Sequence, residues 1–421
     1  MTEKRKNTIW VLSELYYPEM EGSGYYVTRI AEALAVRHRV RVLSVQPTYK
    51  ARGIKAPTNE VVHHVRIHRC LSTTFNKDIL LFRLINLLTI SLSIFFNALR
   101  RVHPGDIVLV ITNPPSLPFI ACIISKLRNA KLILRVEDLY PDVLVATGMF
   151  KPEAPPVKIL YALHQELYHR ADRIIVLGRG MLDLVKRRIA QDAAHAALIT
   201  HWADSDSILP LPRENNTLLD RLGLSRQFVI QCSGNMGRIY DLEILVRSAK
   251  ILETQGNIHF LFIGAGAKEP ALKKIIADLK PKNVTLLPPQ PHSDLPELLN
   301  ACDLAAISFI RGMAGISVPS RMYNIMAAGK PILAVVDAKS ELAQVIAEEQ
   351  IGWIIPPDSD PQTIASTILK AKDDPGLLAE MSVRARRAAV DKYARPLIMQ
   401  KHNDLMDQIT LSDPSFLRDA S

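Results

Sequence analysis

The stretch Val318-Pro-Ser-Arg-Met-Tyr-Asn-Ile-Met-Ala-Ala-Gly-Lys-Pro-Ile332 decides how the rest of the chain is interpreted. It starts as a proline-marked loop, continues as an apolar helical run and stops at a glycine, and residues 332–336 are typical of a buried parallel strand. A helix start offers unpaired N–H groups, and Arg321 adds a planar donor fork, so we expect this stretch to bind the diphosphate end of a ligand. A loop, helix and strand with a purely structural role would show the same pattern.

Length and composition indicate a globular protein of more than one domain. The chain has 421 residues, 48% of them hydrophobic and 22% charged, which fits two domains of roughly 150–220 residues. The four cysteines lie far apart in apolar stretches without the spacing of metal ligands, so we expect reduced, buried thiols in a cytoplasmic protein. The N-terminus leads directly into the strand-like residues 9–12, and we expect no signal peptide.

The formal net charge of +10 indicates an anionic partner. Nucleic acid is not expected, because no RNA-binding motif occurs and the basic residues are not interleaved with aromatic ones. Anionic lipid headgroups and a phosphorylated substrate both remain compatible with this charge.

Strands, glycine loops and helices alternate in both halves of the chain. Strand Thr8–Ser13 precedes a loop with Gly22 and Gly24, and strand 228–232 precedes the loop Ser233-Gly-Asn-Met-Gly-Arg-Ile-Tyr-Asp241. A helix follows each loop, as in doubly wound parallel sheets. The fold class predicted is therefore α/β, with two doubly wound, Rossmann-like domains that face each other across a cleft.

The nearly apolar segment Ile79–Leu99 is long enough to cross a membrane. Predicted strands flank it on both sides, and a single crossing would separate strands that should share a sheet. The favoured interpretation is a helix packed on the sheet. A helix whose exposed face also enters the membrane surface and a true span are the two alternatives.

Glu137 and Asp138 directly follow the buried strand Lys131–Val136. The carboxyl ends of parallel strands are where such sheets hold their ligands, although a capped turn would explain the pair as well. A glycosidase would need two carboxylates ~5–10 Å apart, and neighbours in the chain point in different directions, so we do not expect glycoside hydrolysis.

Six motifs in order resemble the family 4 glycosyltransferases with the GT-B fold, especially the bacterial branch that builds O-antigen, capsule and colanic-acid-type polysaccharides. The resemblance covers nearly the whole chain. It rests on Tyr17-Pro-Glu-Met-Glu-Gly-Ser-Gly24, Asn113-Pro-Pro115, Glu137-Asp-Leu-Tyr-Pro-Asp142, Ser233-Gly-Asn-Met-Gly237, Asp303-Leu-Ala305 and the opening stretch through Pro331.

The resemblance implies a metal-independent, retaining transfer of a hexosyl or N-acetylhexosaminyl group from a UDP- or GDP-sugar, with no cofactor. It implies an N-terminal acceptor-binding domain over residues 1–205, a C-terminal nucleotide-sugar-binding domain over 206–392, and a helical tail over 393–421 that packs back on the N-terminal domain. The positive charge and the apolar segment Ile79–Leu99 suggest a polyprenyl-diphosphate-linked or other glycan acceptor. They also suggest a peripheral position on the inner face of the bacterial cytoplasmic membrane, with lipopolysaccharide or exopolysaccharide as the product.

Residue by residue, the resemblance assigns Asp138 and Glu137 to catalysis. It assigns donor binding to Gly22, Ser23, Gly24, Gly234, Asn235, Gly237, Arg238, Ser320, Arg321 and Asn324. No metal ligand is expected.

Three departures from the family pattern qualify this assignment. Ile316 and Asn324 occupy the positions of two glutamates found in many members. Asn235 and Asp241 stand roughly where the glycine loop usually has Arg and Lys, leaving Arg238 and Arg321 to bind phosphate. Glu137 stands where many members have histidine. A nucleotide-sugar epimerase or hydrolase of the same fold, and a non-catalytic membrane-associated scaffold, are the alternative functions.

Overall fold

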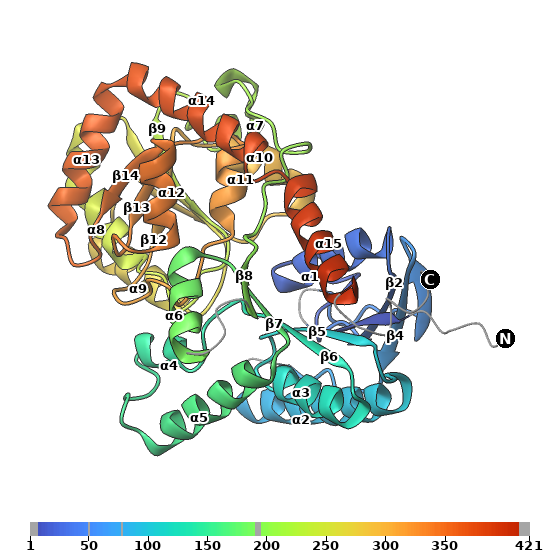
Figure 1. The fold of residues 1–421 in the computed structure, drawn as a ribbon. Helices are drawn as coiled ribbons and strands as arrows, with labels where there is room; N and C mark the ends of the chain where they lie inside the picture. The colour runs from blue at the N-terminus through green and yellow to red at the C-terminus, as the bar shows by residue number, and fades with distance from the viewer. Residues whose placement is uncertain (1–6, 49–50, 77–78, 190–194, 412–421) are drawn as a thin grey trace.

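Two sheets organise the chain (Figure 1). The computed structural model describes residues 7–48, 51–76, 79–189 and 195–411. The N-terminal sheet has eight strands in the order β3-β4-β2-β1-β5-β6-β7-β8, and the C-terminal sheet has six in the order β11-β10-β9-β12-β13-β14. All paired strands are parallel except β3, which is antiparallel to β4. The predicted α/β architecture with two parallel sheets is confirmed.

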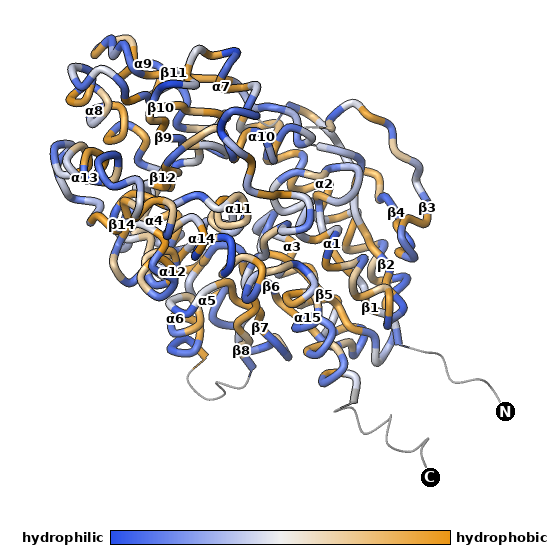
Figure 2. The backbone as a smooth tube through the Cα atoms, turned by 90° about the horizontal axis from the view of Figure 1, so that it is seen from above, coloured by the Kyte–Doolittle hydropathy of each residue, from blue (hydrophilic) through white to orange (hydrophobic). Residues whose placement is uncertain are grey.

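The strands are short and mostly apolar, as expected of sheets covered on both faces. Figure 2 shows β5, β9 and β12 largely in the colour of hydrophobic residues. The N-terminal strands are β1 Thr8–Leu12, β2 Arg39–Val45, β3 Asn59–Val62, β4 Val65–Cys70, β5 Ile107–Ile111, β6 Lys131–Arg135, β7 Arg173–Val176 and β8 Ala196–Leu198. The C-terminal strands are β9 Phe228–Ser233, β10 Ile258–Ile263, β11 Val284–Leu287, β12 Leu304–Ser308, β13 Ile332–Val335 and β14 Gly352–Ile355.

Helices cover both faces of the N-terminal sheet. Helices α2 and α3 lie on one face, and α1 and α15 on the other (Figure 1). The helices of this half are α1 Ser23–Ala35, α2 Leu80–Arg101, α3 Leu117–Arg128, α4 Asp142–Ala146, α5 Pro155–Arg170 and α6 Arg179–Ile189. The remaining helices are α7 Thr217–Arg221, α8 Glu243–Leu252, α9 Glu269–Leu279, α10 Leu295–Asn300, α11 Arg321–Ala327, α12 Glu341–Glu349, α13 Pro361–Asp373, α14 Pro375–Asp391 and α15 Arg395–Leu411.

Helix α2 is, among the described residues, the one helix whose length and composition would allow it to cross a membrane. It packs on the N-terminal sheet through Ile90, Ile94 and Ala98, which are buried. Strands β4 and β5, which precede and follow it, belong to the same sheet. The structure therefore agrees with the favoured interpretation, a helix packed on the sheet.

The chain passes between the two halves twice, and the two passages lie side by side. Ala203 pairs with Ala394 in an isolated parallel bridge, and the Ala203 N–H donates to the carbonyl of Tyr393 at 2.7 Å. Helix α15 then packs on α1, where Arg37 pairs with Asp407 at 3.2 Å. Residues 412–421, the end of the predicted tail, lie outside the described residues.

Candidate functional site

The segments that follow the strands of the two sheets meet between the two halves. Asp138, just after β6, forms an isolated antiparallel bridge with Ser317, which lies just before α11. The adjacent Leu139 N–H donates to the Ile316 carbonyl at 2.9 Å. Ile316, which lacks the carboxylate expected in the family, thus contributes its backbone to this junction.

Glu137 belongs to a largely buried network of charges. Its carboxylate accepts from Arg135 Nε at 2.8 Å and lies 3.3 Å from His201 Nε2. Arg135 is fully buried and also lies 3.4 Å from His402 Nε2, which α15 contributes. Burial by itself would raise the pKa of Glu137, but the charges of Arg135 and His201 outweigh it and lower this pKa to about 2. Glu137 therefore stays ionised and neutralises Arg135.

Asp138 has the opposite electrostatic environment. Burial raises its pKa to about 6 and the charge of Glu137 adds to the rise, while a hydrogen bond from Ser317 works against it. Two neighbouring carboxyl groups with pKa values pushed apart are typical of a site where one group exchanges protons and the other keeps a fixed charge. Asp138 is the member of the pair that changes protonation near neutral pH.

The structure brings Arg321 together with the glycine loop of the C-terminal half. The Arg321 guanidinium donates to the carbonyl oxygens of Ser233 at 2.7 Å and Asn235 at 2.6 Å. It also stacks over the Tyr240 ring, 4.3 Å from its centroid. At Gly234, where φ is +114°, an added Cβ would lie only 3.3 Å from Arg321 Cζ. Arg321 therefore holds the loop in place and brings a positive charge to it.

Only part of this loop faces outward, since Met236 and Tyr240 are buried. Asn235 and Arg238 are exposed, and the structure gives Arg238 no ion pair with any described residue. Gly237 lies against the Asn235 side chain, since a Cβ on Gly237 would be 3.4 Å from Asn235 Nδ2. Arg238 is thus an exposed cation on the loop that Arg321 holds in place.

The N-terminal glycine loop ends at the start of α1. Gly22 has φ +55° and open space around it, whereas a Cβ on Gly24 would lie 2.4 Å from the Glu19 carbonyl oxygen. Ser23 Oγ accepts from Asn113 Nδ2 at 3.1 Å, so the loop lies beside the Asn113-Pro-Pro115 motif.

Ser320 and Asn324, two predicted donor-binding residues of the C-terminal half, lie against the N-terminal half and against the segment by which the chain leaves it. Burial raises the pKa of Tyr26, which lies on α1, and the nearby Ser320 hydroxyl works against this rise. Asn324 Oδ1 accepts from the Asp204 backbone N–H at 2.9 Å. The side-chain oxygen of Asn324 is therefore already bonded within the protein.

Residue patterns did not identify Arg135, His201, His402 and Ser317. A charged side chain inside the apolar strand β6 is the available signal for Arg135, and no sequence pattern marks His201 as a site residue. His402 lies 267 positions from Arg135 in the chain, and no local pattern links them. Within the described residues, no three His, Cys, Asp or Glu side chains gather in a way that could hold a metal ion.

Comparisons with known proteins identify both halves. Residues 21–201 match the model described as a glycosyl transferase 4-like domain, and residues 218–388 match that of glycosyl transferases group 1. "Probable glycosyltransferase WbjE" from Pseudomonas aeruginosa is 32% identical over 268 residues, which are 64% of this chain and 66% of that relative. "Putative colanic acid biosynthesis glycosyl transferase WcaI" from Escherichia coli K12 is 26% identical over 349 residues, 78% of this chain and 83% of that protein.

A solved structure has the same arrangement of domains. Anabaena Alr3699/HepE in complex with UDP and glucose superposes with a TM-score of 0.72 over 96% of this chain and 100% of that chain, at 16% identity. At this identity the likeness concerns the fold. With both halves matched by glycosyltransferase models and with two parallel sheets in the GT-B arrangement, the chain belongs to the family 4 glycosyltransferases.

Proposed function

We propose that the protein transfers a sugar from a UDP- or GDP-sugar to a growing, lipid-linked cell-surface glycan, with retention of configuration and without a metal ion. The observation that carries this proposal is the position of Asp138. Asp138 carries a titratable carboxyl group at the junction of the two halves, beside the ionised Glu137, and it is paired with Ser317 in an antiparallel backbone bridge.

The C-terminal half would hold the donor. Breaking the bond between sugar and diphosphate requires stabilisation of the leaving diphosphate, and cations aimed at developing charge typically contribute a few kcal/mol each. Arg321 donates to carbonyl oxygens of the glycine loop, and the exposed Arg238 follows Gly237 in the same loop. The Anabaena HepE structure holds UDP and glucose, which supports a nucleotide donor.

The reaction would occur on one face of the sugar. The bond from the anomeric carbon to the diphosphate oxygen breaks, and that oxygen accepts the proton of the acceptor hydroxyl. The acceptor oxygen forms the new glycosidic bond on the same face, so configuration is retained. Asp138 orients the acceptor hydroxyl, and Glu137 fixes Arg135 and His201 behind it. The transferred group is of the hexosyl or N-acetylhexosaminyl type.

The proposed acceptor follows from the net charge of the chain, from helix α2 and from a related protein. A net charge of +10 and the apolar helix α2 favour a lipid-linked acceptor at the inner face of the cytoplasmic membrane. The name of the WcaI relative refers to colanic acid biosynthesis, which supports a cell-surface polysaccharide as the product.

The test begins with a thermal-shift screen of UDP- and GDP-sugars, because a ligand that binds only the folded state raises its apparent stability. The stabilising donor is then incubated with and without polyprenyl-diphosphate-linked acceptors. Acceptor-dependent release of the nucleotide diphosphate is the expected result. Steady conversion of the donor without acceptor would indicate an epimerase or hydrolase instead, and binding without turnover on any acceptor would indicate a scaffold.

A further inference from the structure

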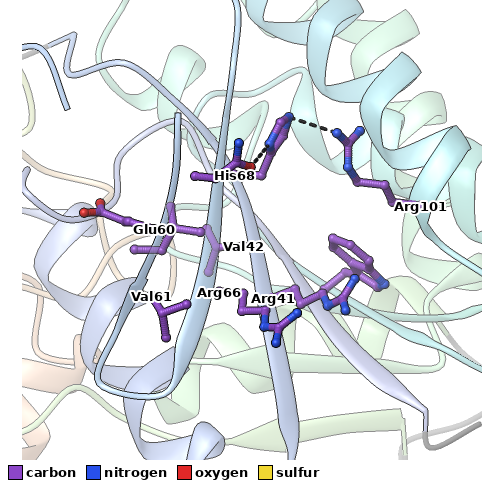
Figure 3. Close-up of a pocket in the computed structure, with 10 residues that line it drawn as sticks. Arg41, Val42, Glu60, Val61, Arg66, His68 and Arg101 are labelled. Atoms are coloured by element: carbon purple, nitrogen blue, oxygen red, sulfur yellow. Dashed lines mark hydrogen bonds between the residues drawn. The ribbon is translucent and has the colours of Figure 1, made fainter. Parts of the chain in front are cut away.

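A hollow of about 380 Å³ lies between the last turn of α2 and the strands β2, β3 and β4 (Figure 3). Arg41, Arg66, His68 and Arg101 are among the residues that line it. Pockets for small molecules typically measure ~300–1,000 Å³ and contain a few converging polar groups. The hollow has the size and the polar groups of such a pocket, and the proposed function does not use it.

The strand register places two arginines side by side in this hollow. Arg41 of β2 pairs with Arg66 of β4, and Trp10 of β1 pairs with Arg41 from the other side. Paired residues on neighbouring strands point to the same face of the sheet, about 5 Å apart. Arg41 lies over the Trp10 ring, 5.5 Å from its centroid. Like charges on neighbouring strands repel each other, so the pair is unfavourable unless a negative charge lies nearby.

The carboxylates near the hollow already have partners. Glu60, which also lines it, is ion-paired with Arg69, and Figure 3 shows its carboxylate pointing away from the arginines of the hollow. Asp106 accepts from an indole N–H and from two backbone N–H groups. Among the described residues, Arg66 and Arg101 have no carboxylate partner. The charge of these two arginines is therefore open to an anionic ligand.

Arg101 is held in a fixed orientation beside His68. Its Nη1 donates to Asn97 Oδ1 at 2.5 Å, and its Nη2 lies 3.1 Å from His68 Nε2. Burial and the charge of Arg101 lower the pKa of His68, whose Nδ1 lies 2.7 Å from Asn59 Oδ1. A guanidinium has five N–H donors, so these contacts leave donors on Nε and Nη2 of Arg101 for a ligand.

The chemistry of the hollow fits a phosphate monoester. Such a group carries a charge of about −1.5 to −2 at neutral pH, which balances two guanidinium groups. The planar fork of arginine also matches the oxygens of phosphate. The remaining wall contains the exposed Val61 and the polar side chains of Asn59 and His68. An organic group with hydroxyls, of the size of a sugar, fits this mixture of apolar and hydrogen-bonding surface.

We propose that this hollow binds a small phosphate monoester of the sugar phosphate class, with the phosphate group between Arg66 and Arg101 and the sugar against Val61. The site is separate from the reaction edge. Arg41 and Arg66 lie near the amino ends of β2 and β4, whereas Glu137 follows the carboxyl end of β6 in the same parallel sheet. The proposal does not depend on the proposed function.

The first test is isothermal titration of the full chain with glucose 1-phosphate at constant ionic strength. The double variant Arg66→Gln, Arg101→Gln should raise the dissociation constant about tenfold or more. The matched control is Arg187→Gln, an exposed arginine on α6, which should leave the dissociation constant unchanged. Loss of binding in Arg238→Gln with full binding in the double variant would place the ligand in the proposed donor site and overturn the proposal.

Thermal unfolding provides an independent readout of the same site. In phosphate-free buffer, Arg66→Gln should unfold at the wild-type temperature or above it, because the substitution removes the repulsion from Arg41. Glucose 1-phosphate should raise the unfolding temperature of wild type and not that of Arg66→Gln. An equal rise in wild type and in this folded variant overturns the proposal.

Three further comparisons define the ligand and its place. Phenylglyoxal modification followed by mass spectrometry should show that glucose 1-phosphate protects Arg66 and leaves Arg187 reactive. Glucose and glucuronate should bind far more weakly than glucose 1-phosphate, and glucuronate binding as tightly would assign the site to carboxylates and overturn the proposal. Inorganic phosphate binding as tightly as the ester would overturn the assignment of a sugar group. Absence of binding by wild type overturns the proposal and leaves the transferase reaction to its own test.

Discussion

Asp138 and Ser317 pair as an antiparallel bridge although 179 positions separate them, and the Leu139 N–H beside Asp138 donates to the carbonyl of Ile316 at 2.9 Å. The first residue follows a strand of the N-terminal sheet, and the second precedes α11 of the C-terminal half. The proposed catalytic carboxyl group is thus held by the domain that would bind the donor. The bridge that joins the two halves at this point therefore also fixes the position of Asp138.

Replacing Asp138 with Asn should remove the acid limb of the pH–rate profile. Burial raises the pKa of Asp138 to about 6, so wild-type kcat/KM should fall as the pH drops below about 6 and the carboxyl group becomes protonated. The variant should lose about 10²–10³-fold in kcat and show no such limb. Initial rates from pH 5 to 9 measure both, with Asp183→Asn on the exposed side of α6 as the control. Full transfer by Asp138→Asn with the normal product would disprove the assignment.

Replacing Glu137 with Gln should reduce stability more than turnover. Arg135 is fully buried and would lose its carboxylate partner, a loss of about 3–5 kcal/mol in the free energy of unfolding. Because the folded pKa of Glu137 is about 2 and its ordinary pKa is 4.5, its stabilisation is complete above about pH 4.5 and is lost as the pH falls towards 2. Urea unfolding should show that the free energies of unfolding of wild type and Glu137→Gln differ less at pH 4 than at pH 7.

The double variant Arg135→Met, Glu137→Leu provides the control for this pair. It removes both charges and should recover part of the stability that Glu137→Gln loses. An equal loss in the single and double variants would mean that the buried charge is not the cause.

The two arginines beside the glycine loop should behave differently. Arg238→Gln should raise the dissociation constant for the nucleotide diphosphate about tenfold, or ~1.4 kcal/mol, with no loss of stability, since its side chain is exposed. Arg321→Gln should weaken nucleotide binding and also lower the stability of the fold, because it loses the bonds to Ser233 and Asn235. Isothermal titration and thermal unfolding separate the two effects. Arg226→Gln, at the opposite end of β9, is the charge-matched control and should change neither.

Replacing Gly264 with Ala should displace the glycine loop. A Cβ at this position would lie 2.0 Å from the Gly234 carbonyl oxygen, so the loop must move. Gly223→Ala adds a Cβ at φ +68° with nothing within 4 Å and serves as the control for backbone strain alone, worth ~1–2 kcal/mol. Gly264→Ala should lose more stability than this and should also weaken nucleotide binding, whereas Gly223→Ala should leave binding intact. Equal binding by both would show that the close approach is not needed.

The positive φ angles of His63 and His64 illustrate where prediction from sequence stops. They form the tight turn that pairs β3 antiparallel to β4 and adds an edge strand that the sequence did not predict. Two-residue hairpin turns usually contain Asn or Gly, and two histidines give no such signal. The same holds for Asn324, whose bond to Asp204 joins positions 120 apart.

Local patterns in the sequence determined the parallel strands, the glycine loops and the packed helix Ile79–Leu99, because apolar periodicity and glycine act over a few neighbouring residues. They also brought Glu137, Asp138 and Arg321 forward as site residues. Only the tertiary structure decided how the two carboxyl groups differ. Glu137 obtains its charge partners from β6 and from His201, and Asp138 obtains Ser317 from the other half. A pKa depends on the charges and burial around a group in space, and the chain supplies these from distant positions.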